Sequence, residues 1–221
     1  GNIKFDLSIG DEQRQSALAI KNRLSENNRK LIWIAASTHQ GEDEIILDAF
    51  AQVRQQLGAR TKQFILILVP RHPERFERVG QLCESRGFNT QRRSRGQLSG
   101  DMDILLGDTM GELMLMFGAS DVAFVGGSLV PNGGHNFIEP AAWGLPLLSG
   151  PHLFNFAEVS QLLQDAGALT LASDASALAK TLMILIADET LRNEQGKKAL
   201  QVALDNRGAL DKTLTLIKNC I

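Results

Sequence analysis

The chain has 221 residues, of which 43% are hydrophobic and 22% charged, and its formal net charge is -2 at pH 7. This composition is ordinary for a soluble globular protein with a substantial core, and the near-neutral charge gives no support for nucleic-acid binding. The only cysteines, Cys83 and Cys220, lie far apart, which predicts a reducing compartment and no disulfide framework. No apolar run reaches the roughly 18 residues that span a bilayer.

Short apolar runs alternate with helical patterns along most of the chain. Buried strands are predicted at 31–36, 64–69, 104–106, 122–125, 145–148 and 168–171, with a weaker one at 88–91. Helices are predicted from about 44 to 57, 73 to 86, 111 to 120, 136 to 143 and 155 to 165. Residues 92–101 are predicted to be a loop, and residues 173–221 two or three helices with breaks near Asp188 and Gly208.

This alternation predicts right-handed βαβ units, and therefore an α/β fold with a Rossmann-like parallel sheet and helices on both faces. One domain, residues 29–221, is the simplest division, preceded by a linker and a helix in residues 1–28. The chain begins at Gly1 without a methionine. We therefore expect a fragment of a longer protein or a processed form.

The segment 126–140, GGSLVPNGGHNFIEP, is the most informative part of the chain because it follows a predicted strand. Glycine pairs in this position let the backbone approach a ligand and leave amide N–H groups pointing outward. Asn136 followed by Glu139 is typical of a capping box at a helix start, which is a ready site for phosphate. A Gly-rich turn before a well-capped helix is the alternative.

Each predicted strand is followed by polar residues, and the carboxyl ends of parallel strands share one edge of a sheet, where ligands bind. All four histidines of the chain fall in these clusters. The clusters are Ser37-Thr38-His39, Arg71-His72, Asp108 with Gly111-Glu112, Gly126-Gly127-Ser128 with His135-Asn136 and Glu139, and Gly150-Pro151-His152.

Each cluster also has a purely structural interpretation. Ser37 and Thr38 are equally suited to cap the next helix, and Glu112 to favour a helix start. Arg71 is predicted to be functional, because its guanidinium fork pairs with phosphate or carboxylate oxygens. A solvated loop is the favoured interpretation of Arg92, Arg93 and Arg95, with contact to anionic lipid as the alternative. The apolar stripe is predicted to be core and consists of Leu113, Met114, Met116 and Phe117.

Several classes of protein are disfavoured by missing motifs. No G-x-G-x-x-G follows the first strand, which argues against a dinucleotide site, and no GxxxxGK[ST] motif supports P-loop chemistry. The histidines lack i, i+4 spacing and no His-Cys cluster supports zinc. The G-x-S-x-G elbow of hydrolases is also missing.

Taken together, the motifs resemble the C-terminal half of bacterial 3-deoxy-D-manno-octulosonic acid (Kdo) transferases of lipopolysaccharide synthesis. The resemblance runs from Gly1 to about Phe156 and rests on GNIKFD, AASTHQGEDE, VPRHPERF, LGDTMGEL, DVAFVGGSL and GGHNFIEPAAWGLPLLSGPHLFNF. It implies the C-terminal domain of a GT-B glycosyltransferase, which holds the donor CMP-Kdo. The N-terminal domain, which is absent from this chain, would hold the lipid A precursor (lipid IVA), a membrane anchor and the general base.

The resemblance also implies which residues contact the donor. The CMP contacts carried over by motif are Pro70, Arg71, Met110, Gly111, Glu112, Asn136, Phe137, Ile138 and Glu139. Arg71 would pair with phosphate or the Kdo carboxylate, and Glu139 would accept hydrogen bonds from the ribose diol. Further candidates are Ser37, His39 and His135, which would face the Kdo moiety, and Gly127 and Ser128. Phe137 departs from the small or proline-like residue expected at its position.

The implied reaction is an inverting displacement in which the leaving CMP phosphate is stabilised by helix N-termini and Arg71. No catalytic residue, cofactor or metal is expected in this chain, since no acidic cluster suits Mg²⁺. The partners implied are CMP-Kdo, the lipid acceptor and the cytoplasmic side of the bacterial inner membrane, with no nucleic acid. Two alternatives stay open: another GT-B enzyme or epimerase that uses a UDP-sugar, and a stand-alone nucleotide-binding module without turnover.

Overall fold

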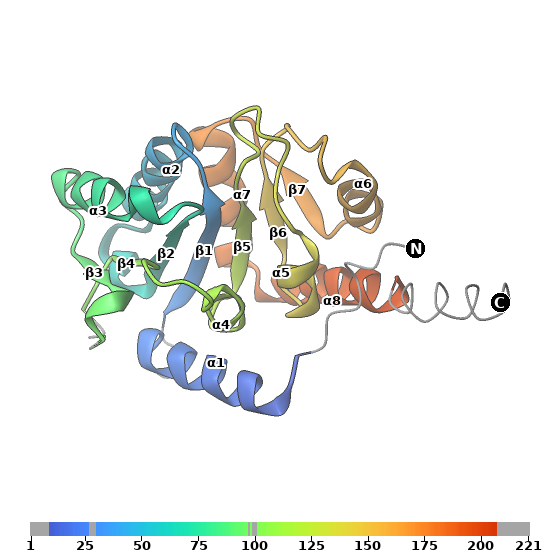
Figure 1. Ribbon diagram of the computed structural model, residues 1–221, viewed down its shortest axis with the longest axis horizontal. Helices are drawn as coiled ribbons and strands as arrows, with labels where there is room; N and C mark the ends of the chain where they lie inside the picture. The colour runs from blue at the N-terminus through green and yellow to red at the C-terminus, as the bar shows by residue number, and fades with distance from the viewer. Residues whose placement is uncertain (1–8, 27–29, 97, 99–100, 207–221) are drawn as a thin grey trace, which may run out of the picture.

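The computed structural model describes residues 9–26, 30–96, 98 and 101–206, which form a seven-stranded sheet with helices packed on both faces (Figure 1). All the strand pairs are parallel, and the strand order is β3-β4-β2-β1-β5-β6-β7. The predicted α/β fold is therefore confirmed. The strands are β1 (Leu31–Thr38), β2 (Phe64–Pro70), β3 (Thr90–Arg92), β4 (Ile104–Leu106), β5 (Val122–Val125), β6 (Leu147–Ser149) and β7 (Leu169–Leu171).

The helices divide between the two faces of the sheet, each of which has its own hydrophobic core. One core is covered by α1 (Asp11–Leu24), α4 (Leu113–Gly118), α5 (Ile138–Ala142), α6 (Ala157–Asp165) and α8 (Glu189–Asp205). The other core is covered by α2 (Glu42–Leu57), α3 (Phe76–Ser85) and α7 (Ala175–Ala187). None of the helices in these described parts of the chain is both long enough and apolar enough to cross a membrane.

Strand β1 shows why the sheet could be predicted from short apolar runs. Ile32 and Ile34 point into the core beneath α1, α4 and α5, whereas Trp33 and Ala35 point into the core beneath α2 and α7. All four side chains are fully buried. A strand covered on both faces must be apolar at successive positions, which is the pattern of a central parallel strand.

Most predicted boundaries agree with the structure to within a few residues. Strands β4 and β5 match their predicted ranges, and the weak candidate at 88–91 is found as β3 at 90–92. The break at Asp188 is confirmed, and its carboxylate accepts a 2.9 Å hydrogen bond from the Leu191 N–H at the start of α8. The predicted break near Gly208 and Cys220 lie outside the described residues.

Two predicted helix starts are wrong, and both lie beside the predicted site. Helix α4 begins at Leu113 instead of position 111, because Gly111 has a φ of 81° and Glu112 is the N-cap. Helix α5 begins at Ile138, and its N-cap is Phe137 instead of Asn136. The helices are therefore only six and five residues long, which weakens the prediction that their dipoles hold an anion.

The chain changes direction in the sheet between β1 and β5. From β1 it moves outward to β2 on one side, and it later returns to β5 on the other side of β1. The loops after β1 and β5 therefore leave the same edge in opposite directions, which is where ligands bind in open α/β sheets. A Cβ atom on Gly126 would lie 2.5 Å from the Ser37 carbonyl oxygen, so only glycine lets the two strand ends approach this closely.

Candidate functional site

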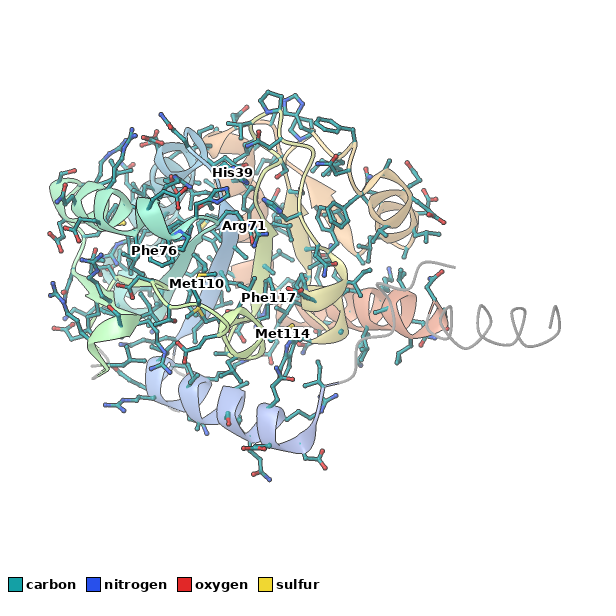
Figure 2. The ribbon with its side chains drawn as sticks, in the orientation of Figure 1. His39, Arg71, Phe76, Met110, Met114 and Phe117 are labelled. Atoms are coloured by element: carbon teal, nitrogen blue, oxygen red, sulfur yellow. The ribbon has the colours of Figure 1, made fainter. Side chains whose placement is uncertain are left out.

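The polar clusters that follow the central strands meet at the switch point between β1 and β5. His39 follows β1 and His135 lies in the loop after β5, and their Nε2 atoms are 2.7 Å apart. The ring of His72, which follows β2, lies edge-on to that of His39, with 5.3 Å between the ring centroids. Figure 2 shows His39 together with Arg71 near the ends of the central strands. The structure thus brings together histidines from three different strand exits.

The histidine pair is held in its neutral form. Burial, with support from nearby positive groups, lowers the pKa of His135 from 6.5 to about 4. Burial also lowers the pKa of His39, although the Glu42 carboxylate opposes the shift. Because the Nε2 atoms face each other, one ring donates a hydrogen bond and the other accepts it. The pair is therefore a polar but uncharged surface near pH 7.

Glu42, the first residue of α2, binds the loop that follows β5. Its side chain is fully buried, and its carboxylate accepts hydrogen bonds from the N–H groups of Gly127, Ser128 and Leu129 at 2.7–2.9 Å. A fourth hydrogen bond, of 2.8 Å, comes from the N–H of His39. The prediction that the pair Gly126-Gly127 leaves its amides free for a ligand is wrong, because the Gly127 N–H binds this carboxylate and the Gly126 N–H donates to the Ala36 carbonyl at 2.8 Å.

The role of Glu42 was missed in the sequence. Its spacing of three residues from His39 is the one local signal, because a carboxylate at that distance can reach back to a preceding N–H. The other three partners are more than 80 positions away along the chain. Local patterns could not have revealed them.

The two candidate serines, Ser37 and Ser128, have roles in the local backbone structure. Ser128 is fully buried, and its hydroxyl donates to the Val125 carbonyl at 2.7 Å and accepts from the Gly150 N–H at 2.8 Å. Ser37 adopts a left-handed conformation with a φ of 56°, next to an irregularity in the pairing of β1 with β2. Neither Ser37 nor Thr38 caps α2, whose N-cap is Gly41, so that alternative interpretation is also wrong.

Arg71 and Arg75 leave the end of β2 and have different environments. Arg75 donates to the Thr38 carbonyl at 2.5 Å and forms a buried ion pair with Asp43, so it holds the loop after β1. Arg71 is exposed, and its guanidinium has no hydrogen-bond or ion-pair partner in the described part of the chain. Its backbone N–H donates to the Thr38 carbonyl at 3.0 Å, which fixes its position at the strand exit. Arg71 is therefore the cation available to an anionic ligand at this edge.

Asn136 and Glu139 interact, but not as the predicted capping box. The Asn136 carboxamide accepts from the Ile138 N–H and donates to the Glu139 carboxylate, both at 3.0 Å. Glu139 thus accepts from the side chain of Asn136 instead of its backbone. Burial raises the pKa of Glu139, while the hydrogen bond from Asn136 and the charge of Arg71 oppose that rise. The charge of Arg71 therefore reaches Glu139, although no hydrogen bond or ion pair joins the two side chains in the described structure.

Three of the predicted contact residues lie in the interior. The side chains of Phe137 and Ile138 are buried in the core beneath α5 and α8, and Phe137 packs edge-on against Phe156. Pro70 is also buried, as the last residue of β2. Only the backbone of these residues can face a ligand. The unexpected phenylalanine at 137 is thus explained as a core residue beneath the loop.

The loop after β4 brings Met110, Gly111 and Glu112 to the same edge. Met110 is 68% exposed (Figure 2). Apart from its chain neighbours, no atom lies within 4 Å of the position that a Cβ atom on Gly111 would take, so both residues are accessible to a ligand. Burial opposes ionisation of Glu112, but hydrogen bonds from Thr109 and Arg93 outweigh it and lower the pKa of this carboxyl. The Arg93–Glu112 ion pair measures 2.6 Å. Glu112 is therefore held as a carboxylate by neighbours within the chain.

The same contacts correct the interpretation of the arginine-rich segment. Arg92 pairs with Glu77 at 2.6 Å and with Asp108 at 2.9 Å, and Arg93 pairs with Glu112. Two of the three arginines thus bind acidic side chains instead of projecting into solvent as a loop, and only Arg95 is exposed. The apolar stripe of α4 is confirmed as core, with Met116 and Phe117 buried and Leu113 and Met114 partly buried against it.

Two further observations concern the capacity of the described residues to bind a metal and the position of a cavity. Within residues 9–26, 30–96, 98 and 101–206, no group of three or more His, Cys, Asp or Glu side chains could hold a metal ion. A cavity of about 620 Å³ is lined by residues that include Lys21, Asp121, Trp143 and Arg192. It contains none of the predicted site residues and lies at the opposite edge of the sheet, where β1 and β5 begin.

Comparisons with known proteins place the chain among sugar transferases. No family model matches the chain. It is 44% identical to the 3-deoxy-D-manno-octulosonic acid transferase of Haemophilus influenzae over 99% of its own length and 50% of that protein. It is 33% identical to the enzyme of the same name from Bordetella pertussis, again over 99% of its length and 50% of the relative. The chain thus spans about half the length of the curated relatives it matches.

A solved structure shows which half this is. The C-terminal CMP-Kdo binding domain of WaaA from Acinetobacter baumannii matches with a TM-score of 0.80 and 33% sequence identity. The match covers 87% of this chain and 98% of that domain. At this identity and coverage, the likeness extends beyond the fold to the family. The chain therefore belongs to the 3-deoxy-D-manno-octulosonic acid (Kdo) transferase family of glycosyltransferases and corresponds to their C-terminal, GT-B-type domain.

Proposed function

We propose that this chain binds CMP-Kdo and is the donor half of an enzyme that transfers Kdo to a lipid A precursor. The observation that carries the proposal is the 33% identity to a CMP-Kdo binding domain, over 98% of that domain. The geometry supports it, because the exposed guanidinium of Arg71 lies at the switch-point edge without a partner among the residues that the structure describes. A nucleotide-sugar donor brings to that edge the anion that Arg71 lacks.

Each accessible group has a role in this proposal. The fork of Arg71 pairs with phosphate oxygens of the donor. Glu139 accepts hydrogen bonds from the ribose hydroxyls, with Asn136 holding its carboxylate in place. The backbone at Gly111 approaches the ligand closely because no side chain intervenes, and the exposed Met110 side chain offers apolar surface to the pyrimidine ring.

The chemistry of transfer requires a second half. We propose that a base on the N-terminal half removes a proton from the acceptor hydroxyl, which attacks the anomeric carbon and inverts it. The bond to the CMP phosphate breaks, and Arg71 stabilises the charge that develops on that leaving group without a metal ion. The acceptor, lipid IVA, and the cytoplasmic face of the inner membrane are partners of the whole protein in this proposal.

A transfer assay tests the proposed function. The chain is fused to the N-terminal half of the Haemophilus influenzae relative and supplied with CMP-Kdo and lipid IVA, with the intact relative as the positive control. The proposal predicts transfer of Kdo by the fusion and loss of transfer when Arg71 is replaced by alanine. A fusion that uses a UDP-sugar in place of CMP-Kdo would contradict it.

A further inference from the structure

We propose that His39 and His135, with His72 and Arg71 beside them, form a proton-linked subsite for the carboxylate of the donor sugar. The pair takes up one proton from solvent when the carboxylate binds. This inference rests on the proposed function, because CMP-Kdo is the ligand that supplies a sugar carboxylate. It adds to that function a change in the protonation of the histidine pair when the sugar carboxylate binds.

The geometry of the pair allows one added proton. The Nε2 atoms are 2.7 Å apart and the rings are nearly parallel, 9° between their planes, so one hydrogen lies between the two nitrogens. Neither Nδ1 atom has a hydrogen-bond partner within the described part of the chain. A proton added at the Nδ1 atom of the donating ring gives the pair one positive charge and keeps the Nε2 contact. A second proton would place two N–H groups against each other and break it.

Burial, and after it the charges around the pair, explain why the pair is neutral without a ligand. The groups that act on it are His72, Arg71 and Arg75, which disfavour protonation, and Glu42, which favours it. Arg75 already forms an ion pair with Asp43, and the carboxylate of Glu42 is occupied by four backbone N–H groups. Arg71 is the cation of this set without an internal counter-charge. In the proposed function the donor phosphate supplies that counter-charge, and a carboxylate placed against the rings beside it would favour the imidazolium form.

The three amides that follow β5 most closely are not available to this anion. The N–H groups of Gly127, Ser128 and Leu129 already bind Glu42. The rings of His39 and His135 lie beside these amides, and a protonated ring is a cationic hydrogen-bond donor that can bind a carboxylate.

Calorimetry of the 221-residue chain tests this inference. CMP-Kdo and CMP are each titrated at about pH 6.5, the ordinary pKa of histidine, in MES and in Bis-Tris, whose ionisation heats differ. The difference in binding heat between the two buffers gives the number of protons taken up. His135→Gln is the test variant, and His152→Gln, which makes the same change at the exit of β6, is the matched control.

With CMP-Kdo, we expect the wild type and His152→Gln to bind as much as about one proton more than His135→Gln does. With CMP, we expect no such difference between the variants. Equal uptake by His135→Gln and the wild type with CMP-Kdo would overturn the inference and leave the proposed function intact. The same excess with CMP would assign the proton to the phosphate and overturn the carboxylate subsite. Failure of the wild type to bind either ligand would overturn the proposed function, and this inference with it.

Discussion

The carboxylate of Glu42 accepts a 2.7 Å hydrogen bond from the backbone N–H of Gly127, across the point where the chain changes direction in the sheet. Glu42 is fully buried and Gly127 is also buried. The contact joins the start of α2 to the loop after β5, and it leaves Arg71 and the histidines as the groups that face outward. The energetics of this contact and the chemistry of the outward face can be tested separately.

Removal of the Glu42 carboxylate should destabilise the domain. Glu42→Ala leaves two buried and two partly buried N–H groups without their acceptor, which we expect to cost about 3–5 kcal/mol of unfolding free energy. Glu42→Gln keeps one oxygen acceptor and should cost about 1–3 kcal/mol. Urea unfolding followed by circular dichroism measures both. Glu74→Ala, at an exposed position, is the control and should change stability by less than about 0.5 kcal/mol.

Arg71→Ala should weaken CMP binding without destabilising the fold. Loss of charged hydrogen bonds to phosphate corresponds to a decrease in affinity of about 10- to 100-fold. Arg71→Lys keeps the charge but loses the fork, so its affinity should lie between those of the wild type and the alanine variant. Arg60→Ala removes another exposed arginine, at the opposite edge of the sheet, and should bind CMP as the wild type does. Equal affinities for Arg71→Ala and Arg60→Ala would show that the phosphate binds elsewhere.

Glu139→Ala should weaken CMP binding through loss of the ribose contact. We expect a decrease of about 1–3 kcal/mol in binding free energy, because a partly buried acceptor is removed from two hydroxyl donors. The comparison with 2′-deoxy-CMP makes the test specific, since the deoxynucleotide should lose less affinity in the variant than CMP does. Glu158→Ala, which removes an exposed acid from the first turn of α6, is the matched control. Wild-type affinity in Glu139→Ala would refute the ribose assignment.

The stability of the free domain should depend on the histidine pair in acid. The pKa of His135 is about 4 in the folded chain against an ordinary 6.5, so the unfolded chain binds more protons between these values. Its contribution to stability is therefore complete above pH 6.5 and is lost as the pH falls toward 4, by at most about 1.4 kcal/mol per pH unit. His135→Gln should flatten this part of the pH profile of unfolding. A slope unchanged from that of the wild type would contradict the assignment.

The sheet could be predicted from the sequence because its strands are buried on both faces and therefore appear as short apolar runs. The polar residues at the strand exits were also predictable, because parallel strands share one carboxyl edge. The details of the loops were not. Gly111 moves the start of α4 through its positive φ, and Asn136 bonds to Ile138 and Glu139 in a geometry that its spacing does not specify.

Partners distant in the sequence explain the remaining errors. The amide of Gly127 was predicted to point outward to a ligand, but Glu42 reaches it from more than 80 positions away. Arg92 and Arg93 were predicted to be solvated, but their acidic partners lie on other elements of the fold. Long-range ion pairs and the partners of buried carboxylates depend on the tertiary fold. Local sequence patterns therefore indicate the candidate groups, but not which of them already bind a partner within the chain.

The measurement that tests the central claim most directly is a calorimetric titration of the 221-residue chain with CMP, UMP and UDP in the presence of a chelator. A cytidylate donor domain should bind CMP saturably and more tightly than UMP, and the chelator should not change the affinity. Tighter binding of UDP than of CMP would contradict the account and would favour a transferase or epimerase that uses a UDP-sugar.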